Sequence, residues 1–245
     1  MKNIIIIGAT SAMAAEVAKL YALDNSDLYL VARDTSKLDM IKKDLIVRGA
    51  NSVETKYFNA NDFKSHKMLI DEAFDSLGHV DVLLIAHGSL PNQELCQADN
   101  LKAVEEINTN GVSVISILTQ AATKMEQQKS GNITVISSVA GDRGRQSNYV
   151  YGAAKGMVST FLQGLTQRLN KSGVHVLDIK PGFVDTPMTA DFDKGVLWAK
   201  PEKIAKIIKQ RIDKKRNFSY APSFWLIVML IIRSLPAFIF NRIKI

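Results

Sequence analysis

Residues 4–14 read Ile4-Ile5-Ile6-Ile7-Gly8-Ala9-Thr10-Ser11-Ala12-Met13-Ala14. Four consecutive β-branched residues are typical of a parallel strand that is buried on both faces. Gly8 begins a turn, and residues 12–23 follow with the periodicity of a helix. A strand, a glycine turn and a helix N-terminus form a site for a pyrophosphate, because free backbone N–H groups and the helix dipole point at it. The stretch therefore predicts the start of a nucleotide-binding domain.

The same alternation of strand and helix continues along the chain. Further strands are expected at residues 28–32, 53–58, 80–86, 131–137, 174–179 and 218–221. Helices are expected at residues 12–23, 35–48 and 63–77, through most of 93–128, from about 150 to 171, and at 201–216. Alternating elements imply right-handed crossovers. The sequence thus predicts an α/β fold of the Rossmann type, a doubly wound parallel sheet of six to seven strands with helices on both faces.

Length and composition suit one globular domain. The 245 residues are 47% apolar and 22% charged, which is ordinary for a soluble protein with a sizeable core. We expect residues 1–222 to form a single NAD(P)-binding Rossmann domain that includes the catalytic and substrate-loop regions. Residues 223–245 are expected to form an apolar helical segment with basic flanks.

The numbers and positions of the cysteine and histidine residues bear on disulfide bonds and metal sites. The single cysteine, Cys96, excludes an internal disulfide and fits a reducing compartment, so we expect a cytoplasmic protein. The four histidines are scattered and Cys-rich motifs are absent, so no metal site is expected. The N-terminal apolar run ends at Gly8 and is too short for a signal peptide. The net charge of +7 comes without a nucleic-acid-binding motif, so nucleic-acid binding is disfavoured.

Ligands in such sheets bind beyond the C-terminal ends of the strands. Gly8, Arg33, Gly88, Ser138 and Pro181 all fall at predicted strand ends. An NAD site usually carries an acidic residue after its second strand, whereas Arg33 suits a 2′-phosphate; the alternative is a surface arginine. The convergence of these five positions is the strongest indication of a nucleotide site.

Two further positions fall near the same edge. Asn59 follows the third strand, where an adenine edge could be met. His87 lies near the cofactor by this topology, but we interpret it as a structural or turn histidine.

A tyrosine and a lysine stand four residues apart, and Ser138 precedes the tyrosine by thirteen. Tyr151 and Lys155 therefore share one face of the expected helix. An ammonium beside a phenol favours the phenolate, so Lys155 is expected to lower the pKa of Tyr151 toward working pH. Such a phenol suits proton transfer to a carbonyl. Taken alone, the pair is more often an ordinary surface pair.

Two asparagines, Asn108 and Asn110, interrupt an apolar pattern that Val112, Ile115 and Leu118 continue. A buried asparagine needs hydrogen-bond partners. Either asparagine could therefore be a structural device or part of a polar network.

In this order the residues resemble the short-chain dehydrogenase/reductase superfamily over nearly the whole chain. The resemblance rests on the turn at residues 8–14, Asn108, Ser138, Tyr151 with Lys155, and residues 181–186. It implies that Tyr151 protonates a carbonyl oxygen and that Ser138 polarises it. It implies that Lys155 holds the nicotinamide ribose and that Asn108 anchors a water of the proton relay. A homodimer or homotetramer is also implied.

The resemblance implies a dinucleotide site, with NADP(H) favoured over NAD(H) because of Arg33. The residues it assigns to that site are Gly8, Thr10, Ser11, Met13, Arg33, Asn59, Ala60, Gly88, Tyr151, Lys155, Pro181, Gly182, Val184 and Thr186. The chain departs from the family pattern at three places. Ala12 and Ala14 replace two glycines of the turn, the motif after the fourth strand keeps only Gly88, and Asn59 replaces an aspartate.

The C-terminal segment narrows the resemblance to one branch. Residues 224–240 look like the tail of the branch typified by decaprenylphosphoryl-2-keto-erythro-pentose reductase, which implies a keto-sugar substrate, perhaps lipid-linked, in envelope polysaccharide synthesis. The 17 apolar-rich residues include Arg233 and Pro236, and they are marginal for spanning ~30 Å of hydrocarbon. Basic flanks (Lys214, Lys215 and Arg216; Arg242 and Lys244) suit a helix lying on an anionic inner leaflet. A cover over the substrate pocket, a subunit interface and a spanning helix are the alternatives.

Together these features predict an NADPH-dependent oxidoreductase that reduces a ketone to a secondary alcohol. A small-molecule or lipid-linked carbonyl compound would be the substrate. The alternatives are a non-catalytic NADP-sensing or membrane-surface scaffold protein and a general carbonyl or 3-oxoacyl reductase.

Overall fold

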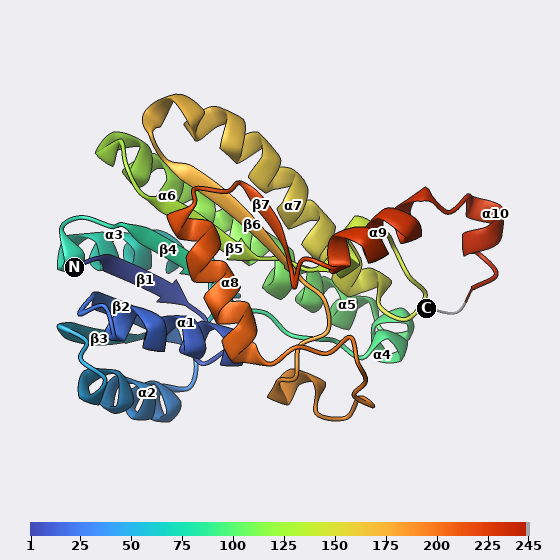
Figure 1. The fold of residues 1–245 in the computed structure, drawn as a ribbon, viewed down its shortest axis with the longest axis horizontal. Coiled ribbons are helices and arrows are strands. Elements are labelled where there is room, and N and C mark those ends of the chain that lie inside the picture. Colours follow the sequence, from blue (N-terminus) through green and yellow to red (C-terminus); the bar gives the residue numbers. More distant parts are fainter. Residues whose placement is uncertain (244–245) are drawn as a thin grey trace.

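A computed structural model describes residues 1–243 of the chain. Seven strands form one parallel sheet in the order β3-β2-β1-β4-β5-β6-β7 (Figure 1). The strands are β1 (Asn3–Ile7), β2 (Asp27–Ala32), β3 (Ser52–Tyr57), β4 (Val82–Ile85), β5 (Asn132–Ile136), β6 (His175–Pro181) and β7 (Phe218–Ala221). The strand order reverses between β1 and β4, which places a ligand crevice beyond the C-terminal ends of these two strands.

Helices connect successive strands. The α-helices are α1 (Ala12–Ala22), α2 (Thr35–Val47), α3 (His66–Leu77), α4 (Gln93–Ala98), α5 (Asn100–Ile107), α6 (Ser113–Gln128), α7 (Tyr149–Leu169), α8 (Pro201–Asp213), α9 (Trp225–Ser234) and α10 (Ala237–Phe240). A π-helical turn, η1 (Asn108–Val112), joins α5 to α6, and short 3-10 turns are η2 (Val139–Asp142), η3 (Asn170–Ser172) and η4 (Pro187–Thr189).

The isoleucine run of β1 explains why the sheet is covered on both sides. Ile5 and Ile7 belong to a core cluster with residues of α3, α6 and α7. Ile4 and Ile6 belong to a second cluster with residues of α1, α2 and α8. Because successive side chains of a strand point to opposite faces, an unbroken apolar run is needed when helices cover both faces (Figure 1).

The predicted doubly wound parallel sheet is confirmed, and the last strand falls at the predicted residues 218–221. The expected long helix at residues 93–128 differs, because it is divided into α4, α5, η1 and α6. One break is at Asp99, whose carboxylate accepts hydrogen bonds from the backbone N–H groups of Leu101 and Lys102 and so caps a new helix.

The C-terminal segment leaves the sheet after β7 and ends in two short helices, separated at Pro236 (Figure 1). Trp225 and Met229 of α9 are buried in a small third cluster with Val139 and Tyr220. Lys244, part of the predicted basic flank, lies outside the described residues.

Candidate active site

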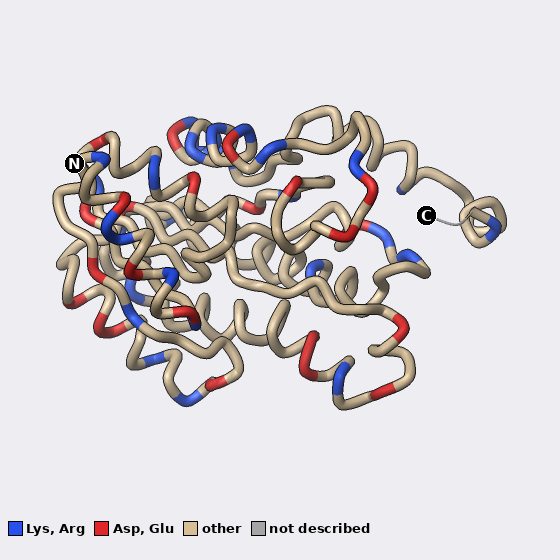
Figure 2. The backbone as a smooth tube through the Cα atoms, turned by 90° about the horizontal axis from the view of Figure 1, so that it is seen from below, with Lys and Arg blue, Asp and Glu red and all other residues tan. Residues whose placement is uncertain are grey.

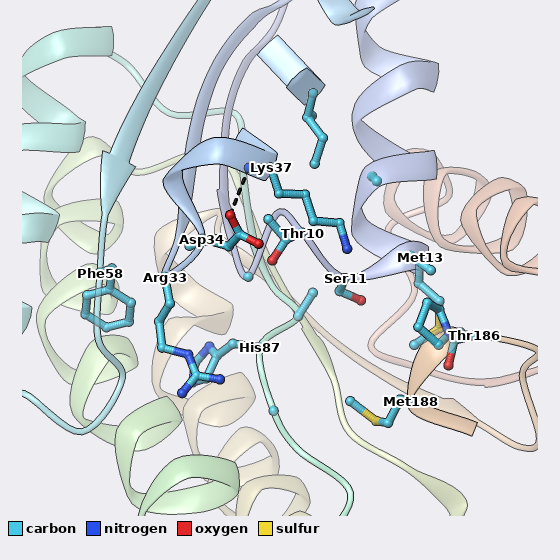
Figure 3. Close-up of a pocket in the computed structure, with 18 of the residues that line it drawn as sticks. Thr10, Ser11, Met13, Arg33, Asp34, Lys37, Phe58, His87, Thr186 and Met188 are labelled. Carbon is cyan, nitrogen blue, oxygen red and sulfur yellow. Dashed lines mark hydrogen bonds between the residues drawn. The ribbon is translucent and has the colours of Figure 1, made fainter. Parts of the chain in front are cut away.

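A cavity of about 670 Å³ opens beyond the C-terminal ends of the strands. Its lining comes from the end of β2, from the loops that follow β1, β2, β3 and β4, from helices α1 and α2, and from η4 (Figure 3). The predicted cofactor residues that line it are Gly8, Thr10, Ser11, Met13, Arg33, Asn59, Ala60, Gly88 and Thr186. The volume and elongated set of lining loops fit a dinucleotide better than a single small metabolite.

Gly8 lets the chain turn sharply out of β1. Its φ is +85°, and a Cβ there would lie 2.4 Å from the backbone nitrogen of His87. A side chain at residue 8 would therefore push β1 and the loop after β4 apart. The first turn of α1 follows at once, so its backbone N–H groups face the cavity where a pyrophosphate would lie.

The two alanines that replace family glycines have different surroundings. Ala12 lines the cavity, so its methyl group takes up space on the phosphate side. Ala14 is fully buried in the core cluster beneath the sheet, where alanine packs without cost. The alanine at residue 14 therefore affects how helix α1 packs on the sheet, and it does not change the phosphate side of the cavity.

The end of the cavity beside β2 is cationic. Arg33, Lys37 and Lys19 line it, together with the carboxylates of Asp34 and Asp44, and Asp44 pairs with Arg48. The Asp34 carboxylate accepts a hydrogen bond from the backbone N–H of Lys37 at 2.9 Å and caps α2 (Figure 3). One acidic oxygen is therefore engaged in the helix cap, while the Arg33 guanidinium extends into the cavity beside His87.

His87 also lines the cavity, and it is tied to η1 and α6. Its Nε2 is 2.8 Å from the Ser113 hydroxyl, which donates its own proton to the carbonyl of Thr109 at 2.8 Å. Ser113 must then accept, so His87 carries its proton on Nε2 and its Nδ1 is an acceptor. Burial, with lesser effects from the Lys155, His66 and Arg33 charges, lowers the pKa of His87 to about 3. His87 is thus both the structural residue we expected and a neutral wall of the site.

Because His87 is neutral in the folded protein, we predict that it makes the folding stability depend on pH. Between pH 6.5 and about 3 the unfolded chain binds a proton at His87 that the folded protein does not, so folding stability falls as pH drops through this window. Urea unfolding measured between pH 7.5 and 4.5 should give a shallower pH slope for His87→Gln than for the wild type, by about 1.4 kcal/mol per pH unit at the acidic end. Equal slopes for the two proteins would show that His87 is charged in the fold.

Three predicted catalytic residues are brought together next to this cavity. Ser138 follows β5, and its hydroxyl forms a hydrogen bond with Tyr151 of α7. Lys155, one turn further along α7, is buried and donates to the carbonyl of Ile136 at 3.2 Å. Gly88 links the cluster to the cavity, because a Cβ at that position would lie 3.5 Å from the Lys155 ammonium nitrogen.

The expected effect of Lys155 on Tyr151 is wrong. Burial raises the pKa of Tyr151 to about 12, and only the Ser138 hydrogen bond acts to lower it. The reason is geometric: the Lys155 nitrogen lies 5.7 Å from the centroid of the tyrosine ring and donates to a backbone carbonyl. Burial also lowers the pKa of Lys155 to about 8, with the Asp178 charge acting in the opposite direction.

Asn110, rather than Asn108, occupies the site, which corrects our assignment. The Asn110 side chain is fully buried. Its Oδ1 accepts from the backbone N–H of Ser89 at 3.0 Å, and its Nδ2 donates to the Ser89 hydroxyl and to Glu106. The same Oδ1 would lie 2.7 Å from a Cβ on Gly88. Residues two apart on a helix point in roughly opposite directions, so Asn108 faces away from this network.

The remaining predicted cofactor residues lie outside the cavity lining. Pro181 ends β6, and Val184 is buried and bridges to Ala199. Gly182 lies under the indole of Trp225, whose nearest ring atom would be 1.8 Å from a Cβ on the glycine. Thr186, by contrast, lines the cavity and caps η4.

A Rossmann sheet, a dinucleotide-sized cavity and a Ser-Tyr-Lys cluster beside it define an NAD(P)-dependent dehydrogenase/reductase. Residues 2–196 match the family described as short chain dehydrogenase, and the chain belongs to this family. An uncharacterised oxidoreductase of Mycobacterium tuberculosis is 31% identical over 239 residues, covering 98% of this chain and 96% of the relative. An uncharacterised oxidoreductase of Streptomyces coelicolor is 29% identical over 245 residues, covering 100% and 96%.

Solved structures share the fold. A short-chain type dehydrogenase/reductase from Mycobacterium ulcerans matches with a TM-score of 0.81 and 19% identity, covering 89% of this chain and 87% of the other. Actinorhodin polyketide ketoreductase, solved with NADPH, matches with a TM-score of 0.79 and 19% identity, covering 89% and 95%. The family and its oxidoreductase class are therefore confirmed, while the predicted branch stays a prediction.

Proposed function

We propose that this enzyme reduces a ketone to a secondary alcohol with NADPH. The observation that supports it most is the cluster of Ser138, Tyr151 and Lys155 at the end of a dinucleotide-sized cavity. A bound nicotinamide would supply the hydride. The chain's own residues then have to orient the carbonyl and supply a proton.

Each residue of the cluster has a role in this reduction. The Ser138 hydroxyl, hydrogen-bonded to Tyr151, is placed to orient and polarise the carbonyl oxygen. The Tyr151 phenol donates its proton to that oxygen as the alcohol forms. Lys155, an ammonium below its pKa of about 8, would bind the nicotinamide ribose beside the tyrosine. Asn110 holds the loop after β4 in place, through Ser89, beside the lysine.

We infer a preference for NADPH from the cationic end of the cavity. Arg33, Lys37 and Lys19 gather where the adenosine half would lie, and they suit a 2′-phosphate. The nearby acidic residue, Asp34, is engaged in capping α2, which leaves it poorly placed to bind a ribose hydroxyl with both oxygens. The ketoreductase of similar fold that was solved with NADPH agrees with this preference.

Arg33→Asp tests the cofactor preference. Removing the guanidinium and adding a carboxylate should weaken NADPH binding about 100-fold or more, with a much smaller change for NADH, because only NADPH carries the 2′-phosphate. Fluorescence titration of both nucleotides measures the two dissociation constants. Asp34→Asn is the matched neighbour and should leave the ratio in favour of NADPH. An equal loss for both nucleotides in Arg33→Asp means that Arg33 is structural.

For the substrate, we propose a keto-sugar, lipid-linked, in envelope polysaccharide synthesis. The support is the likeness of the C-terminal segment to the decaprenylphosphoryl-2-keto-erythro-pentose reductase branch, and the apolar surroundings of the site. Phe183 stacks on Trp198 at 5.3 Å and meets Trp225 edge-on at 5.1 Å, so aromatic rings from the substrate loop and α9 meet beside the Pro181-Gly182 turn. Sugar rings and isoprenoid chains both pack well on such rings. We accordingly propose that the reaction takes place in the cytoplasm, at the inner face of the membrane.

The deciding experiment is a screen of NADPH oxidation against keto-sugars, polyprenyl-linked keto-sugars and simple ketones. Selective turnover of the sugar compounds supports the proposed substrate class. Turnover of simple ketones or 3-oxoacyl compounds alone favours a general carbonyl or 3-oxoacyl reductase. We expect the active form to be a homodimer or homotetramer, which size-exclusion chromatography with light scattering would measure.

The second candidate is a non-catalytic NADP-sensing or membrane-surface scaffold protein. Its support is the altered cofactor turn, where Ala12 adds a methyl group to the phosphate side of the cavity. The two candidates differ in turnover. NADPH binding without oxidation by any carbonyl compound favours the sensor, and no NADPH binding at millimolar concentration favours the scaffold.

A further inference from the structure

The outer face of α9 is apolar and exposed. Leu226, Ile227, Leu230 and Ile231 expose 55%, 64%, 67% and 57% of their surface. Their spacing of one and four residues places them on one face of the helix. Exposed Phe238 and Ile239 continue this apolar character into α10. We call these six residues the tail face. Exposed apolar side chains that gather on one face, rather than standing singly, mark an interaction surface.

The charge of the same segment is of one sign. Residues 222–243, which follow β7, contain two arginines and no aspartate or glutamate. Arg233 and Arg242, both exposed, lie at the end of α9 and just after α10. Figure 2 shows this part of the tube, which leads to the right-hand end near C, with Lys and Arg colours only. Apolar side chains flanked by cations complement an anionic lipid surface.

The geometry of the segment fits a helix that lies on a bilayer. The ten residues of α9 extend roughly 15 Å, about half of the hydrocarbon thickness. Pro236 then separates α9 from α10. Within residues 1–243, no helix is long and apolar enough to cross a membrane.

The opposite face of α9 is fixed to the catalytic region. Trp225 lies against Gly182, and Met229 is fully buried. Arg143, which directly follows η2, donates to the carbonyls of Ile232 and Leu235 at 2.6 and 2.7 Å. Its guanidinium also lies 3.8 Å from the centroid of the Phe240 ring. The loop that begins at Ser138 therefore holds both α9 and α10 in place, and the tail face is presented by a rigid support.

We propose that the tail face docks on the anionic surface of a lipid bilayer, with α9 lying between the lipid and the active site. The helix that touches the membrane also carries Trp225, which packs beside the Pro181-Gly182 turn. A substrate with a lipid anchor could then reach the site without leaving the interface. This last consequence rests on the proposed function, but the docking itself does not.

A second copy of the chain is the competing occupant. An isologous contact brings identical surfaces together, so Arg233 and Arg242 of two copies would face each other without acidic partners from the same segment. That like-charge arrangement opposes self-association and favours an anionic partner. The charge of the segment is thus the observation that selects the bilayer.

Vesicle flotation of the full-length protein tests the proposal. It should float with phosphatidylcholine vesicles that contain phosphatidylglycerol and much less with phosphatidylcholine alone, and added salt should reduce the bound fraction. Leu230→Glu should weaken vesicle binding about tenfold or more. It replaces a leucine that would be buried in the lipid with a carboxylate that the anionic lipid repels. Val47→Glu, at an even more exposed apolar position on α2, is the control away from the tail face and should float as the wild type does.

The outcomes separate the possibilities. A full-length protein that does not float overturns the proposal. An oligomer that Leu230→Glu dissociates, without flotation by the wild type, assigns the tail face to a subunit interface instead. NADPH binding is measured on every variant to show that the fold is intact. If the reductase proposal is wrong, the failure appears in NADPH binding or in turnover, whereas the flotation result is unaffected.

Discussion

Tyr151→Phe is expected to reduce ketone-dependent NADPH oxidation by about a thousandfold, at the centre of the range for a lost general acid. Phenylalanine keeps the ring and its packing in α7 but removes the proton that the site would transfer to the carbonyl oxygen. The NADPH dissociation constant should stay within about threefold of the wild type, because the phenolic oxygen is hydrogen-bonded to Ser138 and Tyr151 is not among the described residues that line the cavity. Steady-state kinetics and a fluorescence titration measure the two quantities separately.

Ser138→Ala is the companion variant. It removes the hydroxyl that orients the carbonyl but leaves the proton donor, so its loss should be about 10- to 1000-fold. A Tyr151→Phe protein with near wild-type turnover would falsify the assignment of the general acid. Loss of NADPH binding in Tyr151→Phe would instead show that the tyrosine holds the nucleotide.

The raised pKa of Tyr151 suits the direction we propose. With a pKa of about 12, the phenol keeps its proton at neutral pH and can give it to a carbonyl. Oxidation of an alcohol needs the phenolate, which is scarce at that pH. Reduction should therefore be nearly independent of pH around neutrality, and alcohol oxidation should accelerate as pH rises.

The fold could be read from the sequence because its determinants are local. Ile4 to Ile7 alternate between the two core clusters, and that double burial is what an unbroken β-branched run signifies. Gly8, Ser138 and Pro181 follow strands, so the topology alone brings them to one edge. Residues 8, 33 and 88 line the cavity for the same reason.

Non-local contacts were beyond the reach of the sequence. Nothing in the segment around Gly182 indicates that Trp225 would lie against it. The Arg143 contacts to the carbonyls of α9 and the pKa of Tyr151 also depend on packing between distant segments. The cap at Asp99, in contrast, is a local signal that could have divided the long helix.

The error at Asn108 came from following the wrong helical stripe. Val112 and Ile115, which are in phase with Asn108, are only half-buried. The fully buried stripe of α6 is Val114, Ile117, Leu118 and Ala121, and Asn110 is in phase with it. A polar residue in phase with the most apolar stripe was the signal that would have pointed to Asn110.

Asn110→Ala should lower the free energy of unfolding by about 2 kcal/mol, because it leaves the backbone N–H of Ser89 without its acceptor and removes one of the donors to the buried Glu106 carboxylate. Turnover of the folded fraction should fall as well, since the same side chain holds the loop with Gly88 beside Lys155. Urea unfolding and single-turnover kinetics measure the two effects.

Asn108→Ala is the matched control, a half-buried asparagine two residues away in the same π-helical turn. It should cost no more than about 0.5 kcal/mol, the usual size for a substitution outside a buried network. A pattern in which Asn108→Ala is the more damaging change would restore the assignment made from family spacing. Equal losses would mean that the π-helical geometry of η1, which both asparagines share, matters more than the side-chain network. A large difference in the expected direction would place the Ser89–Asn110–Glu106 network, rather than η1 as such, behind the position of Lys155.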